Sequence, residues 1–264
     1  MSGRVEGKIA LITGSGSGLG RAAARHLAEE GANIIVSDLN EDSAQETAGA
    51  INADHPGAAV AAHHDVTSED DWADVLKTAN NHFGSLHILL NNAGISIHGP
   101  IEDVAFETWK QVQEVNVDSV FWGCKLALPF MKEAGGGSII NISSTAALYA
   151  NPMTLSYGVS KASVSYMTKS IALHCAQKRY NIRCNSIHPT FIKTPLLERL
   201  ADAAGRKLED VHQSLGNVVP MGDVLEPRDV TFAVIYLASD ESKMMTGAEF
   251  VIDGGLTAGY LPQI

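Results

Sequence analysis

Residues 13–20 read Thr-Gly-Ser-Gly-Ser-Gly-Leu-Gly, and this glycine-rich stretch decides the fold. It follows the apolar run Lys8–Thr13 and precedes a stretch with helical spacing, Arg21–Glu30. Glycines let the backbone turn tightly and approach a ligand, and the free N–H groups at a helix N-terminus favour a bound phosphate. A strand, a glycine turn and a helix in this order predict a site for the pyrophosphate of a dinucleotide.

The alternation of strand and helix continues along the chain. Helical stretches such as Ser68–His82, Ala105–Lys132 and Ser156–Gln177 separate short apolar runs that are rich in β-branched residues. The predicted strands are Lys8–Thr13, Asn33–Ser37, Ala59–His63, Leu86–Leu90, Ser138–Ile142, Ile182–Ile187 and Glu249–Ile252. We therefore expect the α/β class, as a Rossmann-type doubly wound sheet of seven mostly parallel strands with helices on both faces.

One segment interrupts this rhythm, between about residues 195 and 222. Two helical stretches, Leu196–Ala204 and Lys207–Leu215, lie there before the helix predicted at Pro227–Ser239. They are either an ordinary packed helix pair or a mobile lid over a pocket. Because no linker or internal repeat divides the chain, we expect a single dinucleotide-binding domain over residues 1–264, with a substrate lid at about 195–222.

Composition excludes several classes of function. Of the 264 residues, 30 are acidic and 19 basic, and the net charge of −11 argues against a nucleic-acid partner. No apolar run approaches the length of a membrane span. The three cysteines, Cys124, Cys175 and Cys184, form no CxxC pair, which argues against a disulfide framework or a metal site. We expect a cytoplasmic protein.

An acidic residue, Asp38, stands at the end of the second predicted strand, 18 positions after Gly20. A carboxylate there can accept hydrogen bonds from both hydroxyls of the adenosine ribose and would repel a 2′-phosphate. No Arg or Lys lies in the glycine loop or at positions 39 and 40. The alternative is that Asp38 merely caps the following helix. We predict NAD rather than NADP as the cofactor.

Two further residues, Tyr157 and Lys161, are four positions apart and share one face of a predicted helix. A free phenol titrates near ~10, and a neighbouring cation lowers that pKa toward the range useful for proton transfer. Ser144 follows the fifth predicted strand, so it can face the ligand crevice beyond the carboxyl ends of the strands. A serine there can equally serve only the turn.

Taken together, these motifs resemble the short-chain dehydrogenase/reductase family across essentially the whole chain. Asp65 and Val66 are similar to the family's pair beside the adenine ring, and Asn91-Asn92-Ala93-Gly94 to the motif that closes the fourth strand. Asn116 is similar to the helix asparagine that completes a catalytic tetrad. The resemblance implies these cofactor-binding residues: Gly14, Ser17, Gly18, Leu19, Asp38, Asp65, Val66, Asn92, Ala93, Gly94, Tyr157, Lys161, Pro189, Ile192 and Thr194.

The resemblance also implies a role for each catalytic residue. Tyr157 would be the general acid–base, and Ser144 would hydrogen-bond the reacting oxygen. Lys161 would hold the nicotinamide ribose and lower the pKa of Tyr157. Asn116 would kink its helix and hold a water molecule that relays protons to Lys161. Hydride would pass between the substrate carbon and the nicotinamide.

One position departs from the family pattern. Where glycine usually follows Pro189, this chain has Thr190, whose β-branched side chain is less permissive of a close approach to the nicotinamide. The neighbouring His188 is interpreted as structural, because the tetrad already supplies a path for the proton. Thr194 would offer a hydroxyl to the carboxamide.

The expected pocket is apolar or mildly polar, and no Arg or Lys cluster is apparent to clamp an anion. The residues expected to contact the substrate are Ile95, Ser144, Leu148, Tyr157, Phe191 and Leu197. They favour a small, hydrophobic secondary alcohol or ketone, and several stretches are similar to bacterial hydroxysteroid dehydrogenases. The family further implies a homotetramer, formed through two long helices, the last strand and the C-terminal tail.

Two alternatives remain open. A 3-oxoacyl-carrier-protein-type reductase should prefer NADPH and carry a basic patch for its acidic carrier, which neither Asp38 nor the net charge supports. A non-catalytic dinucleotide sensor would commonly lack one of the catalytic residues, whereas all four are present here. Replacing Tyr157 distinguishes an enzyme from a sensor, because in an enzyme it should abolish turnover and leave NAD binding.

Overall fold

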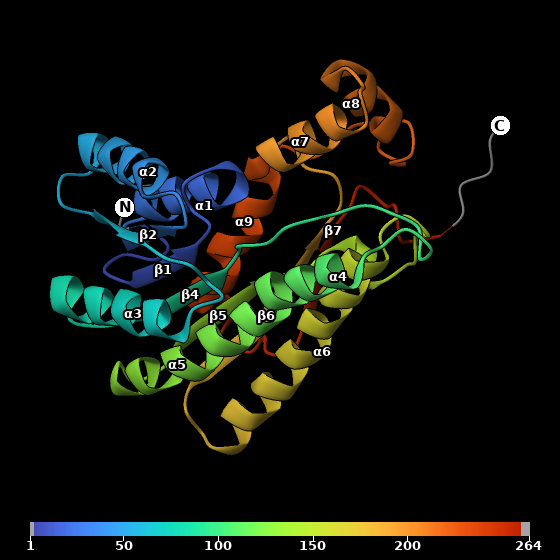
Figure 1. Cartoon of the computed structure of the whole chain (residues 1–264). Helices are drawn as coiled ribbons and strands as arrows, with labels where there is room; N and C mark the ends of the chain where they lie inside the picture. Colours follow the sequence, from blue (N-terminus) through green and yellow to red (C-terminus); the bar gives the residue numbers. More distant parts are fainter. Residues whose placement is uncertain (1–2, 260–264) are drawn as a thin grey trace.

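The computed structural model describes residues 3–259, and its strands form a single sheet (Figure 1). The strands are β1 Ile9–Thr13, β2 Asn33–Asp38, β3 Ala59–His63, β4 Ile88–Asn91, β5 Gly137–Ile142, β6 Ile182–Pro189 and β7 Glu249–Ile252. Their order is β3-β2-β1-β4-β5-β6-β7, and every pairing is parallel. The predicted fold class is confirmed, and the strand bounds agree with the predicted ones to within two residues.

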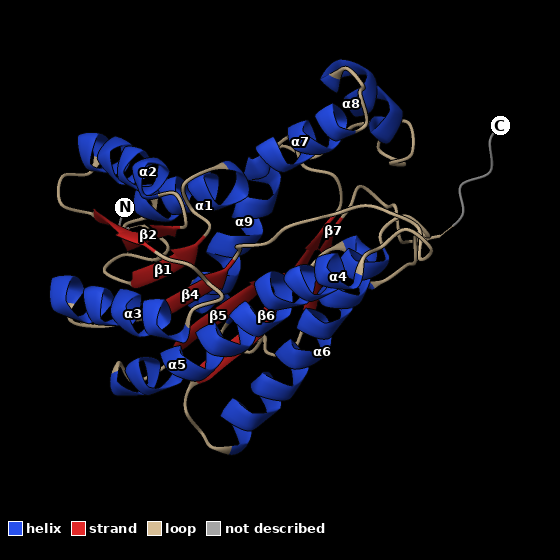
Figure 2. Cartoon of the chain, viewed as in Figure 1, coloured by secondary structure: helices blue, strands red, loops and turns tan. Residues whose placement is uncertain are grey.

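Helices cover both faces of the sheet. They are α1 Gly18–Glu29, α2 Glu41–Asp54, α3 Glu69–Phe83, α4 Phe106–Gln113, α5 Ser119–Glu133, α6 Leu155–Gln177, α7 Pro195–Ala203, α8 Leu208–Gly216 and α9 Pro227–Ala238. Figure 2 shows α1, α2 and α9 on one face and α3, α5 and α6 on the other. The sequence patterns did not single out α2, because its buried face consists mainly of small side chains with weak apolar periodicity.

Two hydrophobic cores lie on opposite sides of the sheet, and β1 contributes to both. Ile12 packs in the core shared with α1 and α9, while its neighbour Leu11 packs in the core shared with α3 and α5. Successive residues of a strand point to opposite faces, so a strand covered on both sides must be apolar throughout. This explains why the strand signals are continuous apolar runs.

The long helix predicted at Ala105–Lys132 contains an irregular turn. Between α4 and α5 the chain forms a π-helical segment, η1, at Glu114–Asp118. Buried Asn116 lies in this segment, where its Oδ1 accepts from Ile95 N at 2.8 Å and its Nδ2 donates to Ile95 O at 2.9 Å. Single π turns in helices commonly occur at functional sites.

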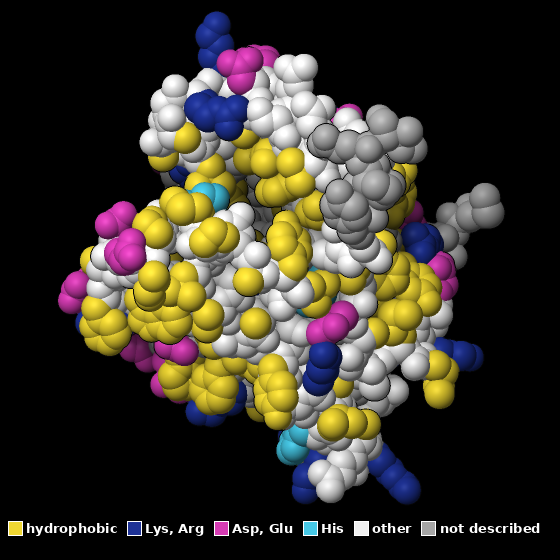
Figure 3. Space-filling model, turned by 90° about the vertical axis from the view of Figure 1, so that its right-hand side faces the viewer, with side chains coloured by type: hydrophobic (Ala, Val, Ile, Leu, Met, Phe, Trp, Pro, Cys, Tyr) yellow, Lys and Arg dark blue, Asp and Glu magenta, His cyan; other side chains and the backbone are white. Residues whose placement is uncertain are grey.

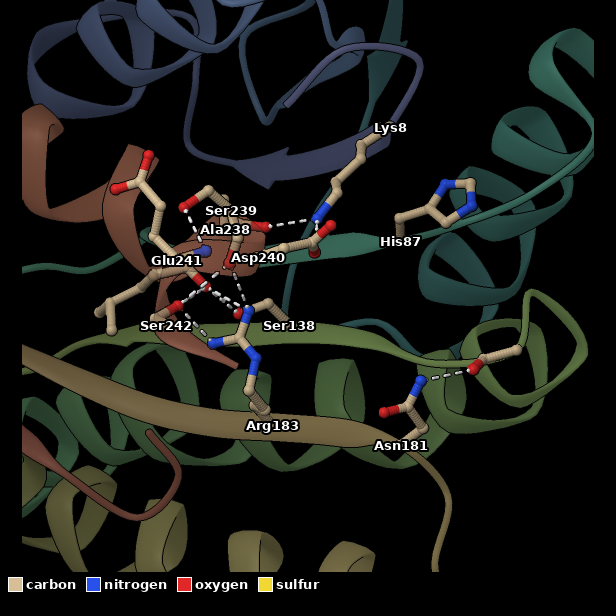
Figure 4. Close-up of polar contacts among 12 residues, drawn as sticks. Lys8, His87, Ser138, Asn181, Arg183, Ala238, Ser239, Asp240, Glu241 and Ser242 are labelled. Carbon is tan, nitrogen blue, oxygen red and sulfur yellow. Dashed lines mark hydrogen bonds and ion pairs between the residues drawn. The ribbon is translucent and has the colours of Figure 1, made fainter. Parts of the chain in front are cut away.

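Two cations fix the C-terminal end of α9 at the edge of the sheet opposite the glycine loop (Figure 4). Arg183 donates to the carbonyl oxygens of Leu237 and Ser239, and Lys8 donates to that of Ala238 and to the Asp240 carboxylate. The last carbonyls of a helix lack intrahelical partners, so cations there satisfy them and oppose the helix dipole.

The 195–222 segment forms α7 and α8, which project above the carboxyl edge of the sheet (Figure 1). Leu197, Ala201 and Val211 form a small apolar cluster of their own, separate from the two main cores. Within residues 3–259, no helix has the length and apolar composition needed to span a bilayer. Residues 260–264 of the tail expected to assist assembly lie outside the described chain.

Candidate active site

A cavity of about 1000 Å³ runs along the carboxyl edge of the sheet. Its walls come from the glycine loop, the ends of β2, β4, β5 and β6, the first turns of α6, and the α7–α8 segment. Figure 3 views this edge, with the lobe of α7 and α8 at the top and hydrophobic side chains gathered beneath it. Open parallel sheets bind ligands at this edge, where successive connections leave on opposite faces.

The glycine loop forms one end of the cavity, and Asp38 is bonded to it. The Asp38 carboxylate accepts from Gly16 N at 2.9 Å and from Asn40 N at 3.0 Å. The residue that caps α2 is Asn40, whose side chain accepts from Ser43 N. The structure therefore does not support the alternative that Asp38 is only a helix cap.

Beside this carboxylate, the segment after β3 forms the wall predicted to meet the adenine. Asp65 and Val66 both line the cavity, and Val66 O accepts from the indole of Trp72 at 3.0 Å. The preceding residue, His64, is buried, with its Nδ1 3.0 Å from Ser37 Oγ and its ring edge-on to Trp72. Burial lowers the pKa of His64 to about 4, so the imidazole is neutral at physiological pH. Sequence reasoning missed this histidine.

The motif after β4 fastens the glycine loop to the centre of the sheet. Asn92 Nδ2 donates to the carbonyl oxygens of Thr13 and Gly14, at 2.9 and 3.1 Å. Thr13 Oγ1 in turn accepts from Asn92 N and Ala93 N, each at 3.0 Å. A Cβ on Gly94 would lie 3.2 Å from Asn116 Oδ1, so this glycine permits a close approach to the residues behind it.

The predicted catalytic residues meet at the middle of the cavity. Ser144 follows β5, and Tyr157 and Lys161 occupy the first turns of α6. Lys161 Nζ donates to Ile142 O at 2.9 Å and lies 5.7 Å from the centre of the Tyr157 ring. Asn116 stands behind the wall and donates to Ser160 Oγ at 3.0 Å. The structure thus brings all four residues to one place.

Burial dominates the titration of this group. It raises the pKa of Tyr157 above its ordinary value, although hydrogen bonding to Ser144 acts in the opposite direction. It also lowers the pKa of Lys161 to about 8. In the chain alone the Tyr157 pKa is thus raised, in contrast to the expected lowering, because burial penalises the phenolate.

The segment after β6 supplies Pro189, Ile192 and Thr194, which all line the cavity beside the catalytic residues. Thr190 does not have the left-handed φ that would require glycine, so the backbone here is unstrained. Its Oγ1 is buried without a hydrogen-bond partner among the described residues. His188 is buried, with Nδ1 3.1 Å from Ser144 O and Nε2 2.8 Å from Ser186 Oγ, in agreement with a structural role.

Nearly all of the predicted contact residues lie in the walls of this single cavity. They are Gly14, Ser17, Gly18, Leu19, Asp38, Asp65, Val66, Asn92, Ala93, Gly94, Ile95, Ser144, Tyr157, Lys161, Pro189, Phe191, Ile192, Thr194 and Leu197. Leu148 is the exception: it ends the short turn η2 (Thr145–Ala147), is 40% exposed and does not line the cavity. Its contact with the substrate therefore stays a prediction.

Several polar side chains in the cavity walls were not expected. Gln111 and Asn151 lie among the lining residues, as do Arg199 and Arg206 from the α7–α8 segment. Arg206 is engaged with Ser214 Oγ at 2.8 Å. The pocket is therefore less uniformly apolar than the sequence indicated, since residues on the polar face of an isolated helix still reach the cavity rim.

Comparisons with known proteins agree with this geometry. A family model described as enoyl-(acyl carrier protein) reductase matches residues 14–257. The chain is 40% identical over 259 residues to an NADP-dependent (R)-specific alcohol dehydrogenase of Lentilactobacillus kefiri, covering 98% of this chain and 100% of that protein. It is 41% identical over 259 residues to a 3-alpha-(or 20-beta)-hydroxysteroid dehydrogenase of Mycobacterium bovis, with 98% and 93% coverage.

The fold has solved counterparts of similar extent. A short-chain type dehydrogenase/reductase from Mycobacterium marinum superposes with a TM-score of 0.89 at 35% identity, covering 97% of each chain. At that identity and coverage the likeness extends beyond the sheet to the whole chain, including the segments that form the cavity.

Proposed function

This chain belongs to the short-chain dehydrogenase/reductase family, and on that basis we propose that it transfers hydride between NAD and a hydrophobic secondary alcohol or ketone. The observation that carries the proposal is one continuous cavity. It holds the glycine loop and Asp38 at one end and Ser144, Tyr157 and Lys161 in the middle. Reacting groups held together in this way need little further ordering.

The chain's own residues supply the proton chemistry. The Tyr157 hydroxyl exchanges a proton with the substrate oxygen, which Ser144 Oγ hydrogen-bonds as charge develops on it. Lys161 binds the nicotinamide ribose, and Asn116, held by Ile95 and Ser160, shapes the path behind it. The bound dinucleotide supplies the hydride acceptor or donor.

The preference for NAD rests on this chain's Asp38 alone, since the similar alcohol dehydrogenase of Lentilactobacillus kefiri is named as NADP-dependent. The Asp38 carboxylate faces the glycine loop, where a ribose 2′-phosphate would meet like charge. Arg21, which bonds to the same loop, is paired with Glu46 and forms no ion pair with that carboxylate. These contacts favour a free 2′-hydroxyl.

The substrate end of the cavity is the region beneath α7 and α8. Ile95, Phe191 and Leu197 offer apolar surface there, and we assign residues 195–222 to a lid over this part of a single domain. The names of the hydroxysteroid and alcohol dehydrogenases among the relatives support a hydroxysteroid or another cyclic secondary alcohol. The side chains of His98 and Gln111 can form hydrogen bonds with a second oxygen atom of such a molecule.

Assembly and location are also part of the proposal. Tyr166 and Leu173 of α6 are 77% and 72% exposed, and apolar surface of this kind favours burial in a homotetramer. The three cysteines are all free and buried, in keeping with a reducing, cytoplasmic setting. Size-exclusion chromatography with light scattering would test the assembly, and a monomer would contradict it.

Neither alternative is favoured by a specific observation. A reductase of carrier-bound acyl chains needs a basic surface for its acidic carrier, and the net charge of −11 opposes that. A non-catalytic sensor does not require Ser144, Tyr157 and Lys161 to meet in the cavity, as they do here.

Replacement of the tyrosine tests the proposed reaction. Tyr157→Phe should lower NAD-linked turnover of cyclic secondary alcohols by at least about 100-fold, because the acid–base group is lost. Binding of NADH, followed by its fluorescence, should change little. Tyr166→Phe, on the exposed face of the same helix, is the control and should retain activity. Full turnover by Tyr157→Phe, or no activity of the native protein on any hydrophobic alcohol, would refute the proposal.

A further inference from the structure

Arg21, the first residue after the glycine loop, turns back onto that loop instead of extending into solvent. Its Nε and Nη2 donate to Gly16 O at 2.9 and 2.5 Å. The same guanidinium donates to both oxygens of Glu46 on α2, from Nη1 at 3.3 Å and from Nη2 at 2.9 Å. Arg21 therefore joins the loop to α2 through two planar contacts.

These contacts converge on Gly16, which is also bonded to the residue proposed to choose the cofactor. Gly16 N donates to Asp38 at 2.9 Å, while Gly16 O accepts from Arg21. The Asp38 carboxylate and the Arg21 guanidinium thus bond to the amide nitrogen and the carbonyl oxygen of the same loop residue, Gly16. Enzymes of this type that use NADP place an arginine near the ribose to meet the 2′-phosphate. Arg21 shares Gly16 with the Asp38 carboxylate, and its guanidinium is held by Gly16 O and Glu46.

Glu46 is the group that holds it. Its carboxylate is the sole anion within ion-pair distance of Arg21 among residues 3–259, and the pair is bidentate, which is the stronger arrangement for arginine. The arginine side chain is 34% exposed and that of Glu46 is 69% exposed. An ordinary surface pair of this exposure contributes little to stability, so its effect should be sought in ligand binding.

We propose that Arg21 and Glu46 form a specificity-determining pair, in which Glu46 holds the guanidinium on Gly16 and withholds it from a ribose 2′-phosphate. The inference rests on the proposed binding of a dinucleotide at this end of the cavity. Asp38 repels the phosphate directly, and Glu46 withholds the Arg21 guanidinium that could attract it. When neutral residues replace both Asp38 and Glu46, Arg21 becomes free to bind the phosphate.

The test measures NADPH and NADH dissociation constants by fluorescence in an Asp38→Ser background, where the direct repulsion is absent. Adding Glu46→Gln should tighten NADPH binding about tenfold, the worth of one charge-assisted contact, and leave NADH within about twofold. A further Arg21→Gln substitution should abolish the gain. Circular dichroism and thermal unfolding confirm that each variant is folded.

The chain offers a matched control between the same two helices. Arg25 of α1 and Asp54 of α2 form a 3.8 Å pair that touches neither the loop nor the cavity walls. Asp54→Asn makes the same change in net charge and should leave NADPH affinity unaltered. An equal gain from Asp54→Asn and Glu46→Gln, or a gain that survives Arg21→Gln, would overturn the pair's role.

The outcome also separates this inference from the proposed cofactor preference. If the native protein binds NADPH more tightly than NADH, the preference for NAD is wrong whatever Glu46 does. If the native protein prefers NADH and Glu46→Gln brings no gain over Asp54→Asn, the preference stands and the pair has no part in it.

Discussion

The two ends of the cavity are built in different ways. At the adenosine end, backbone and side-chain hydrogen bonds join β1, β2 and β4 to the glycine loop, through Thr13, Gly16, Asp38 and Asn92. At the lid end, α7 and α8 pack on each other through Leu197, Ala201 and Val211, a cluster separate from the main cores. One end is held by directional bonds to the sheet, and the other by a small apolar contact.

This difference indicates which end of the cavity can move or change its side chains. A loop bonded to three strands cannot shift without breaking several hydrogen bonds, so it suits a cofactor whose shape is constant. A helix pair with its own apolar cluster can move or change its side chains while the sheet is unaffected. Substitutions at the two ends should therefore affect different measurements.

The largest effect is expected from Gly20→Ala at the adenosine end. A Cβ on Gly20 would overlap the Gly14 carbonyl and approach Asn92 Nδ2 to 2.6 Å, so the loop must shift. Because a displacement of about 1 Å can cost on the order of 100-fold, we expect NADH affinity to fall by about that factor. Isothermal titration calorimetry measures it.

Gly49→Ala is the matched control on α2. Nothing lies within 4 Å of its added Cβ, and the position is in the helix interior. Alanine there should raise the free energy of unfolding by about 0.5–1 kcal/mol and leave NADH affinity unchanged. Equal losses of affinity in both variants would show that the loop is not rigidly held.

An effect of comparable free energy is expected from His64→Gln, measured as the pH dependence of stability. The pKa of His64 is about 4 in the folded chain and ~6.5 when unfolded, so the unfolded state binds more protons between these values. Stability contributed by the neutral ring is therefore present above pH ~6.5 and lost as the pH falls to about 4. The variant should reduce this loss by roughly 3 kcal/mol.

Urea unfolding at several pH values measures the slope. The exposed His82→Gln is the control, and it should follow the native slope. If the free energy of unfolding of His64→Gln depends on pH as steeply as that of the native chain, the His64 ring is not tightly buried beside Asp65 and Val66.

The smallest effect is expected at the lid end. Leu197→Ala removes apolar surface from the cavity wall, and we expect kcat/KM for a cyclic alcohol to fall about tenfold. Affinity for NADH and the main unfolding transition should change little, because Leu197 packs outside the two main cores. Leu148→Ala, at a residue that does not line the cavity, should lower kcat/KM less than Leu197→Ala does. An equal loss from the two variants would contradict this difference.

The sequence predicted the sheet and the adenosine end well because their requirements are local. Apolar runs reveal strands buried on both faces. The glycines at 14, 16, 18 and 20 permit the tight turn that the backbone makes there. Hydrogen bonding then places Asp38 and Asn92 where their positions after strands indicated.

The remaining features could not be predicted, since they depend on contacts between distant segments. Nothing in the spacing around Asn116 distinguishes a π turn from a regular helix until Ile95 and Ser160 are placed beside it. The place of Leu148 outside the cavity wall depends on the three-residue turn before it. The engagement of Arg21 with Glu46 depends on α2, the helix that sequence patterns left unmarked.

By itself, then, the sequence determined the succession of strands and helices along the chain, the glycine loop and the residues proposed to carry proton transfer. Only the tertiary structure decided that burial raises the pKa of Tyr157, and that Asp38 and Arg21 both bond to Gly16. The physical reason is the sequence distance over which each effect acts. Propensity and periodicity act over a few residues, whereas solvation and ion pairing depend on neighbours that the fold brings together.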